Sequence, residues 1–257
     1  HLEEARTLTG HEEGLFAWLS VREHLRQATG VEPPSNLSVM DMGGASVQVI
    51  TAVDTSQGTI PSDNNADYIQ IHLNGKPQTL FVHSFLGLGQ TLVANQFLDE
   101  ASCFSEGYRL SSGAVGTGDA QHCAGQIFKL IDDIHDVTHV LQSALNSDSP
   151  RTWYVISGLA YLMREAPFSQ NQDNNQNKNE LTNDALIEQA ENTVCRRPWE
   201  VVQQDYPEEE NLSRTCLTAS YYHALIKSYG IAPREPIHLI AEPSEMDWTL
   251  GVALHKG

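Results

Sequence analysis

The chain has 257 residues, enough for one large domain or two small ones with an ample apolar core. Its 33 acidic and 15 basic residues give a net charge of −18, which argues against DNA or RNA as a partner, because clustered Lys and Arg bind phosphate backbones. Hydrophobic residues make up 40% of the sequence, as in a globular protein, and no stretch is long and apolar enough to predict a membrane span. If so acidic a chain binds a phosphorylated small molecule, a divalent metal ion is expected to screen the repulsion.

The first predicted element is a helix that begins in the stretch TLTGHEEGLFAWLS. Thr9 is placed to cap it, and Glu12 follows three residues later, in the register of a capping box. Leu15 and Trp18 then follow at helical spacing. Since Glu12 serves the cap, Glu13 has no evident structural duty. It is either a favourable charge in the first helical turn or a functional carboxylate.

An antiparallel meander is predicted next. LSVMDMGGASVQVITAV indicates two strands around a Gly-Gly turn, and DYIQIHLNG and KPQTLFVHSFL indicate two more, joined at Asn74-Gly75. Helices are expected over about 87–100 and 125–145, with a glycine-rich loop between them.

Helices and strands alternate in the rest of the chain. A strand over 151–157 leads into a helix start at 158–163, and a polar low-complexity loop covers 169–180. Helices are expected over 181–195 and 213–229, a last strand over 236–242 and a terminal helix over 247–255. This order predicts an α/β domain with a mixed sheet.

The four cysteines, Cys103, Cys123, Cys195 and Cys216, form two successive pairs that enclose loops of similar size. None lies in a CxxC motif, so a zinc site is not expected. Local pairing would stabilise the fold by about 3 kcal/mol for each loop in the chain-entropy treatment. Four free buried thiols are the alternative. Two local pairs favour an oxidising compartment.

The stretch MDMGGASVQV, residues 40–49, carries the pattern that most suggests chemistry. An acid at a strand end, followed by two glycines, lets the chain reverse with the amides of residues 43–45 facing an anion. Asp41 could then hold a metal ion beside phosphate oxygens. Ser46 and Gln48 leave the strand on one face and could orient a water but not deprotonate it. A plain hairpin turn shows the same pattern, so the motif alone leaves both interpretations open.

Several stretches together resemble the apyrase family, the nucleoside triphosphate diphosphohydrolases. DMGGASVQV resembles the fourth apyrase signature of that family, and TLTGHEEGLFAWLSV resembles the third. FVHSFLGLGQ, the segment from Cys195 to Cys216 and beyond, and the closing DWTLGVALH are similar to further family stretches. All occur in family order across nearly the whole chain, so the combination is far more specific than any single piece.

The resemblance implies a role for each matching residue. Glu13 matches the general base that activates the attacking water, and Asp41 matches the acid that holds a divalent metal through its water shell. Ser46 and Gln48 match the pair that positions this water. The phosphate-binding amides are those of Gly43, Gly44 and Ala45.

Three further residues lie in stretches that resemble the family. Tyr161 and Tyr221 align loosely with aromatics that flank the nucleotide base, and each is equally compatible with an ordinary core position. His83 belongs to the FVHSFL stretch and is interpreted as structural.

The resemblance also implies an actin-like (RNase H-like) lobe, with a mixed sheet flanked by helices and stabilised by two disulfides. Residues 1–30 would form the helix between two lobes, and 31–257 the second, C-terminal lobe with insertions at about 101–125 and 167–181. The first lobe of the family has its own D-x-G-S-[ST]-G phosphate loop, of which DTSQGT at 54–59 is only a distant echo. The chain also starts at His1, without an initiator Met or signal peptide. We therefore expect a fragment whose first lobe is a separate polypeptide or has been removed.

The implied activity is hydrolysis of nucleoside tri- and/or diphosphates to monophosphate and phosphate, dependent on Mg²⁺ or Ca²⁺. The expected partners are these nucleotides and the N-terminal lobe, in a secreted, periplasmic or other oxidising location. The alternatives are an exopolyphosphatase or kinase of the same superfamily, or a non-catalytic interaction lobe. Glu13 and the Ser46/Gln48 pair favour water as the acceptor, hence hydrolysis. His135 and His139, four residues apart among aspartates, either bind a metal or form a solvated helix face.

Overall fold

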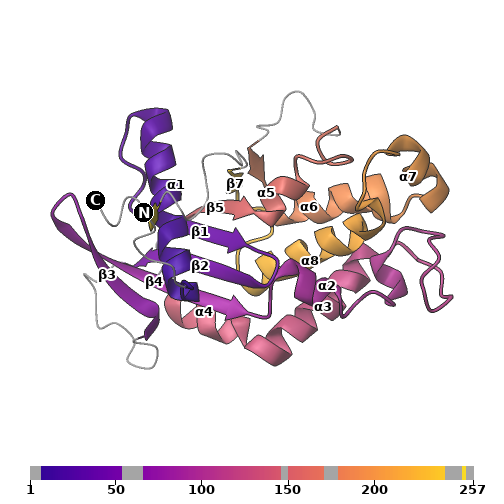
Figure 1. Cartoon of the computed structure of the whole chain (residues 1–257), viewed down its shortest axis with the longest axis horizontal. Coiled ribbons are helices and arrows are strands. Elements are labelled where there is room, and N and C mark those ends of the chain that lie inside the picture. Colours follow the sequence, from indigo (N-terminus) through magenta and orange to yellow (C-terminus); the bar gives the residue numbers. More distant parts are fainter. Residues whose placement is uncertain (1–6, 54–65, 146–149, 171–178, 241–250, 253–257) are drawn as a thin grey trace.

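The computed structural model describes residues 7–53, 66–145, 150–170, 179–240 and 251–252. These residues form a seven-stranded sheet with helices packed around it, as Figure 1 shows. The strands lie in the order β3-β4-β2-β1-β5-β7-β6. Their bounds are β1 Leu37–Met42, β2 Ser46–Val53, β3 Tyr68–Leu73, β4 Lys76–Leu86, β5 Thr152–Ser157, β6 Glu180–Leu181 and β7 Ile237–Leu239.

The sheet is mixed, as the sequence predicts. Strands β1 to β4 pair antiparallel as a meander, whereas β5 runs parallel to β1 and β7 runs parallel to β5. The hairpin between β3 and β4 turns at Asn74 and Gly75, whose φ angles of 51° and 78° suit these two residue types. All six residues of β1 are buried because this strand lies in the middle of the sheet.

Helices cover both faces of the sheet (Figure 1). Helix α1 packs on one face in an apolar cluster that includes Trp18, Val39 and Ile50. Helices α3, α4 and α8 contribute to the larger cluster on the other face, around Met40 and Phe81. The helix bounds are α1 Gly10–Thr29, α2 Gln90–Ala94, α3 Ala120–His135, α4 Val137–Leu145, α5 Gly158–Leu162, α6 Asn183–Ala190, α7 Trp199–Asp205 and α8 Thr215–Ser228.

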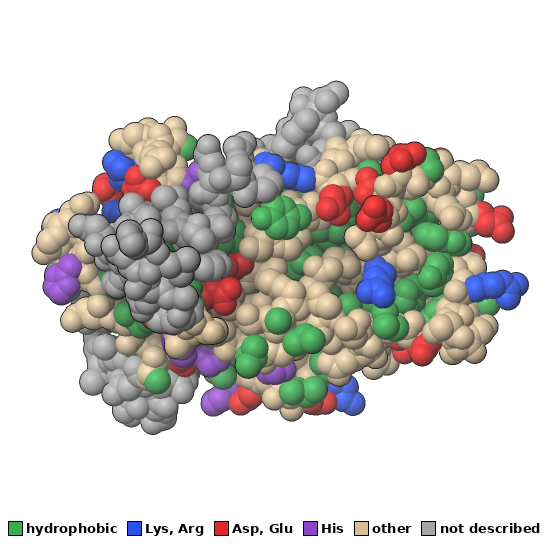
Figure 2. Space-filling view, in the orientation of Figure 1, with side chains coloured by type: hydrophobic (Ala, Val, Ile, Leu, Met, Phe, Trp, Pro, Cys, Tyr) green, Lys and Arg blue, Asp and Glu red, His purple; other side chains and the backbone are tan. Residues whose placement is uncertain are grey.

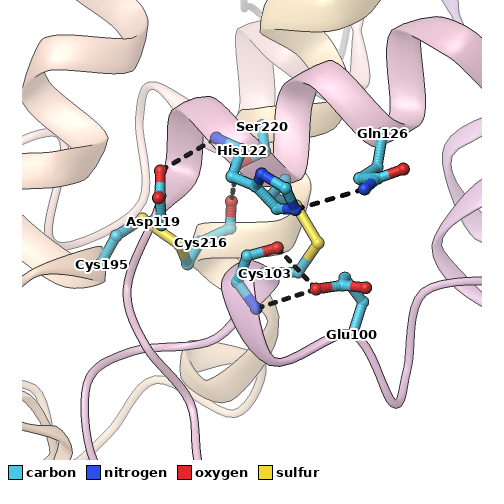
Figure 3. Close-up of a disulfide and its surroundings, with 10 residues drawn as sticks. Glu100, Cys103, Asp119, His122, Gln126, Cys195, Cys216 and Ser220 are labelled. Atoms are coloured by element: carbon cyan, nitrogen blue, oxygen red, sulfur yellow. Dashed lines mark hydrogen bonds between the residues drawn. A yellow bond between two sulfur atoms is a disulfide. The ribbon is translucent and has the colours of Figure 1, made fainter.

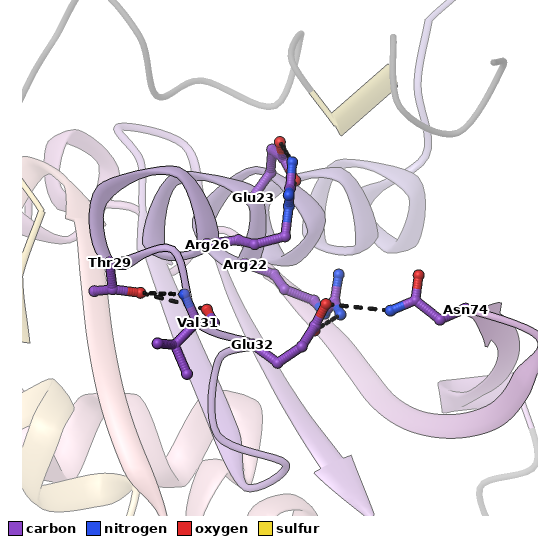
Figure 4. A network of polar contacts seen from close by, with 7 residues as sticks. All are labelled: Arg22, Glu23, Arg26, Thr29, Val31, Glu32 and Asn74. Atoms are coloured by element: carbon purple, nitrogen blue, oxygen red, sulfur yellow. Dashed lines mark hydrogen bonds and ion pairs between the residues drawn. The ribbon is translucent and has the colours of Figure 1, made fainter.

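Helix α1 is fixed at both ends. At its start, the predicted capping box is present: the amide of Glu12 donates to Thr9 Oγ1, and the amide of Thr9 donates to Glu12 Oε2 over 2.9 Å. In its C-terminal half, Arg22 forms an ion pair with Glu32, and Glu32 Oε1 accepts a hydrogen bond of 3.2 Å from Asn74 Nδ2 (Figure 4). These contacts tie the helix to the loop before β1 and to the β3–β4 hairpin.

Two predicted helices differ from the structure. The helix expected over 87–100 is only α2, Gln90–Ala94, followed by turns and a short 3₁₀ helix, η2 Ala101–Cys103. The helix expected over 125–145 begins earlier, at Ala120, where Asp119 Oδ1 accepts from the amide of His122. It breaks into α3 and α4 at Asp136, whose φ of 49° ends a right-handed helix.

The C-terminal half differs in detail as well. The segment expected as one helix over 181–195 contains β6, α6 and a π-helical turn, η3 Glu191–Cys195. Helix α7 and the 3₁₀ helix η4, Leu212–Arg214, were not predicted. Most of the predicted terminal helix, the segment 54–59 and most of the polar loop at 169–180 lie outside the described residues.

The disulfides are those that the cysteine order predicts, Cys103–Cys123 and Cys195–Cys216. Figure 3 shows them close together, where η2 meets α3 and where η3 meets α8. Each bridge closes a loop of about twenty residues and so stabilises the end of the molecule beyond the carboxyl ends of the central strands (Figure 1).

The surface seen in Figure 2 carries scattered charges. Among its coloured residues, Lys and Arg side chains are spread over the face and do not gather into one basic patch. None of the helices in the described ranges is long and apolar enough to cross a membrane.

Candidate active site

The carboxyl ends of β1 and β5 bring Asp41 and Ser157 together. The strands are parallel, and Met42 lies opposite Ser157 in their register. Ser157 Oγ donates a hydrogen bond of 2.6 Å to Asp41 Oδ1, from a backbone conformation with φ 66° and ψ −134°. A non-glycine residue in that region costs about 1–3 kcal/mol, so the surrounding structure holds Ser157 in place against the carboxylate.

Asp41 is a buried carboxylate, only 6% exposed. Burial raises its pKa, and the hydrogen bond from Ser157 offsets this only in part. Since the hydroxyl of Ser157 is neutral, it leaves the negative charge of the ionised carboxylate uncompensated. A bound cation would compensate that charge.

Gln48 connects three other polar side chains at the start of β2. Its Nε2 group lies 2.9 Å from Glu13 Oε2, 2.9 Å from Ser46 Oγ and 3.2 Å from Ser84 Oγ. A side-chain amide has two N–H groups, so three acceptors share two donors. The structure therefore brings Glu13, Ser46 and Gln48 together.

Ser84 was missed at the sequence level. It lies directly opposite Gln48 in the pairing of β4 with β2. The signal was available in the predicted meander, because residues that face each other across two strands share a face of the sheet.

Two glycines allow Glu13 to reach the sheet. A Cβ on Gly10 would lie 2.3 Å from Ser84 Oγ, and one on Gly14 would lie 3.0 Å from Val82 Cγ1. The glycines are four residues apart and therefore share one helix face. Without side chains on that face, α1 lies directly on β2 and β4 and carries Glu13 to Gln48.

Glu13 is half-buried, and its pKa is raised, first by burial and then by the negative charge of Asp41. The two carboxylates therefore influence one another although they come from different elements. A raised pKa makes Glu13 a better proton acceptor than an exposed glutamate, which suits a general base.

The turn between β1 and β2 directs its carbonyl groups toward the segment that contains α2. Three of them accept backbone hydrogen bonds of 2.9 to 3.0 Å: Gly43 from Gln90, Gly44 from Thr91 and Ala45 from Gly87. In a trans peptide, the C=O group and the next N–H group point in opposite directions. The amides of Gly44, Ala45 and Ser46 therefore point away from that segment, as in an anion-binding nest.

The amide of Gly43 behaves differently from the prediction. It donates a hydrogen bond of 3.1 Å to the carbonyl of Ser46, which closes the turn. This bond occupies its single N–H group, so in this arrangement Gly43 does not offer its amide to a phosphate. The outward-facing amides begin one residue later, at Gly44 and Ala45, both of which are exposed.

The two candidate tyrosines lie in different surroundings. Tyr161, on α5, is 41% exposed and stays a prediction. Tyr221, on α8, is fully buried, and its hydroxyl donates a hydrogen bond of 2.6 Å to the carbonyl of Leu88. A ring enclosed in the core is not available to stack on a ligand, so this burial favours the core interpretation of Tyr221.

His83 has a structural contact. Its Nδ1 lies 2.9 Å from Asp67 Oδ2, while His11 Nε2 lies 2.8 Å from Asp67 Oδ1, so Asp67 links β4 to the start of α1. In the described ranges, no group of three or more His, Cys, Asp or Glu residues is placed to hold a metal ion. The alternative of a metal site at His135 and His139 is therefore not supported.

Comparison with known proteins decides the family. The GDA1/CD39 (nucleoside phosphatase) family profile matches residues 1–256. The chain belongs to the GDA1/CD39 family. Ectonucleoside triphosphate diphosphohydrolase 1 of Mus musculus is 24% identical over 305 residues, covering 98% of this chain and 57% of that protein. The chain thus spans little more than half the length of this curated relative.

Solved structures share the fold of this GDA1/CD39 chain. The nucleoside triphosphate hydrolase structure from Neospora caninum aligns with a TM-score of 0.60 at 14% identity, over 98% of this chain and 64% of the other. A Ppx/GppA family member from Aquifex aeolicus aligns with a TM-score of 0.55 at 12% identity, over 97% and 63%. The predicted fold is confirmed: an actin-like mixed sheet with flanking helices and two disulfides.

Proposed function

We propose that this chain is the C-terminal catalytic lobe of an enzyme that hydrolyses nucleoside tri- or diphosphates to monophosphate and phosphate. The observation that carries the proposal is the side-chain amide of Gln48, which contacts both Glu13 and Ser46 at the end of the β1–β2 turn. A base and two groups that can orient a water thus meet beside outward-facing amides. Membership of a nucleoside phosphatase family supports the reaction class.

In the proposed reaction, Glu13 accepts a proton from the attacking water while Gln48 and Ser46 orient it. The water oxygen forms a bond to the terminal phosphorus as the bridging P–O bond breaks on the opposite side. The electron pair of the broken bond stays on the bridging oxygen, which leaves with the shortened nucleotide. The amides of Gly44 and Ala45 hold the phosphoryl oxygens. Neutral Gln48 and Ser46 cannot take the proton, so that role falls to Glu13.

The donor set fits Mg²⁺ or Ca²⁺ held at Asp41. Magnesium in phosphate sites is bound by one or two carboxylates, several waters and the phosphate oxygens of the substrate. A single buried carboxylate with uncompensated charge suits this arrangement better than a cage of protein ligands. The ion would screen the charge of the polyphosphate. We expect a chelator to abolish activity and added Mg²⁺ or Ca²⁺ to restore it; full activity in excess chelator would remove the metal from the proposal.

Replacing Glu13 by glutamine tests the proposal. In the two-lobe enzyme, Glu13→Gln should lower turnover about 10²–10⁴-fold, the usual scale for loss of a general base. Glu12→Gln is the matched control. It makes the same change at the neighbouring residue, and glutamine there can still accept the hydrogen bond of the capping box. Phosphate release should be compared for nucleoside triphosphates, nucleoside diphosphates and polyphosphate. A preference of the two-lobe protein for polyphosphate would indicate an exopolyphosphatase, and no release from any of these substrates by the two-lobe protein would indicate an interaction lobe.

We further assign residues 1–30 to the connection between lobes and 31–257 to the C-terminal lobe, with insertions at about 101–125 and 167–181. In this assignment the chain forms one wall of the site, and a first lobe supplies further phosphate contacts. The lone chain should therefore release phosphate slowly, because loss of preorganised donors costs several kcal/mol in the transition state. Adding the first lobe in trans should restore turnover. A lone chain as active as the two-lobe enzyme would refute the assignment.

Two finer points belong to the same proposal. Tyr161 is the remaining candidate to flank the nucleotide base, since its ring is partly exposed. The two disulfides favour a secreted, periplasmic or other oxidising location.

A further inference from the structure

A partly buried chain of hydrogen bonds connects α8 to the β1–β2 turn through Gln90. The hydroxyl of Tyr222 donates to Gln90 Oε1 over 2.8 Å, and Gln90 Nε2 donates to Thr218 Oγ1 over 3.2 Å. Tyr222 and Thr218 are four residues apart on α8 and therefore share one face of that helix. Both Tyr222 and Thr218 are buried, so these two contacts hold the side-chain amide of Gln90 in one orientation.

The backbone of Gln90 makes the contact on the other side. Its N–H group binds the carbonyl of Gly43, and the next amide, that of Thr91, binds the carbonyl of Gly44. These two carbonyls determine where the amides of Gly44 and Ala45 point, because each peptide group is planar. Gln90 thus contacts α8 through its side chain and the phosphate turn through its main chain.

The hydroxyl of Tyr222 also lies against the end of β1. A Cβ on Gly158 would lie 1.9 Å from Tyr222 Oη and 2.7 Å from the carbonyl oxygen of Met42. The hydroxyl therefore lies beside Gly158, in the region that the carbonyl oxygen of Met42, the residue after Asp41, also approaches. Burial raises the pKa of Tyr222, so its hydroxyl stays protonated and keeps its role as donor.

We propose that Gln90 is a positioning residue, held by Tyr222 and Thr218, which sets the direction of the phosphate-binding amides of Gly44 and Ala45. The proposal rests on the proposed function, because those amides matter for catalysis only if they bind a phosphoryl group. Gln90, Tyr222 and Thr218 do not touch the reacting atoms. They act through the backbone of the turn, so their loss affects rate more than substrate affinity.

The test compares three variants in the active two-lobe enzyme. Tyr222→Phe removes the donor and keeps the ring, Thr218→Val removes the acceptor and keeps the shape, and Gln90→Met removes both side-chain contacts and keeps the backbone amide. Tyr222→Phe should lower kcat about 10-fold with KM changed less than about twofold. In Gln90→Met, adding Tyr222→Phe should produce no further loss, because both act through the same contact.

Tyr229→Phe is the matched control. Tyr229 lies at the end of the same helix, is 2% exposed, and its hydroxyl has no hydrogen-bond partner in the described part of the chain. Its removal should leave kcat within about twofold of wild type. A comparable fall in this control would show that any change of a tyrosine near α8 slows the enzyme, and would overturn the proposal.

Amide hydrogen exchange supplies a readout that does not need activity. Tyr222→Phe should accelerate exchange of the Gln90 and Thr91 amides about 10-fold, and Tyr229→Phe should not. Unchanged exchange in Tyr222→Phe overturns the proposal whatever the kinetics show. If exchange accelerates but the wild-type enzyme releases no phosphate, the proposed function fails while the structural link between α8 and the turn stands. If exchange accelerates and kcat is unchanged in an active enzyme, the positioning role is overturned.

Discussion

Gly89 lies where the segment before α2 crosses the β1–β2 turn, whose amides are proposed to bind phosphate, and replacing it by alanine should disable the proposed site. A Cβ at this position would lie 2.3 Å from the nitrogen of Ala45 and 2.3 Å from the carbonyl carbon of Gly44. An ordinary contact begins at about 3.4 Å, so the two backbones must separate by about 1 Å. The φ of Gly89 is −61°, which alanine adopts freely, and the effect is therefore purely steric.

The expected magnitude follows from that displacement. A misplacement of about 1 Å in a catalytic site can cost about 10²-fold in rate, and inserting a methyl group into a packed contact costs about 1–3 kcal/mol of stability. Gly89→Ala should therefore remain folded at 25 °C and lose about 100-fold in kcat. Phosphate release and denaturant unfolding, measured on the same preparation, separate the two effects.

Gly125→Ala is the control for this substitution. Gly125 lies in α3 with nothing within 4 Å of its Cβ position, so alanine should stabilise the protein by about 0.5–1 kcal/mol and leave the rate unchanged. Activity of Gly89→Ala within twofold of wild type would show that the geometry of the turn is unimportant, and the phosphate nest would have to be abandoned.

Three further predictions concern charge and crosslinks. Asp41→Asn should raise the free energy of unfolding at pH 7, because burial penalises the ionised carboxylate that the substitution removes. It should also abolish hydrolysis, because the proposed metal requires that carboxylate. A variant less stable than wild type would contradict the first expectation. The pKa of Glu13 is raised on folding, so the stability that it contributes is present below the ordinary pKa and is lost as pH rises through the folded-state pKa. The Tm of wild type minus the Tm of Glu13→Gln should accordingly fall from pH 4 to pH 7, while turnover of wild type rises as Glu13 ionises. A Tm difference that does not vary with pH would refute the raised pKa of Glu13. Reducing both disulfides should lower stability by about 3 kcal/mol for each bridge, and non-reducing peptide mapping should recover only the two local pairs.

The sequence predicts best those elements whose signals are local. The capping box at Thr9 and Glu12, the Asn74-Gly75 hairpin and the pairing of nearby cysteines all depend on residues close together in the chain, and all are present. Another local signal contradicts a helix start at residue 125. Asp119 is a good N-cap residue, and it marks the true start of α3.

Features that depend on tertiary contacts escaped prediction. Apolar periodicity runs across Asp136, so it gives no sign that the helix breaks there. Tyr221 and Tyr222 are neighbours in the sequence, yet one hydroxyl binds the carbonyl of Leu88 and the other binds Gln90. Helix α8 is buried on nearly all sides, so no polar face in the sequence indicates which tyrosine points toward the site.

The ambiguity of the Asp-x-Gly-Gly motif has the same origin. A plain hairpin and a phosphate nest share the same residues at 41–44, and they differ in which way the peptide groups face. That direction is set by the amides of Gly87, Gln90 and Thr91, which bind the three carbonyls of the turn from a segment more than forty residues away. A motif search confined to residues 40–49 therefore lacks the information that separates the two interpretations. The same motif placed in a hairpin without such a segment should form a turn whose amides are free to rotate, and it should bind phosphate weakly.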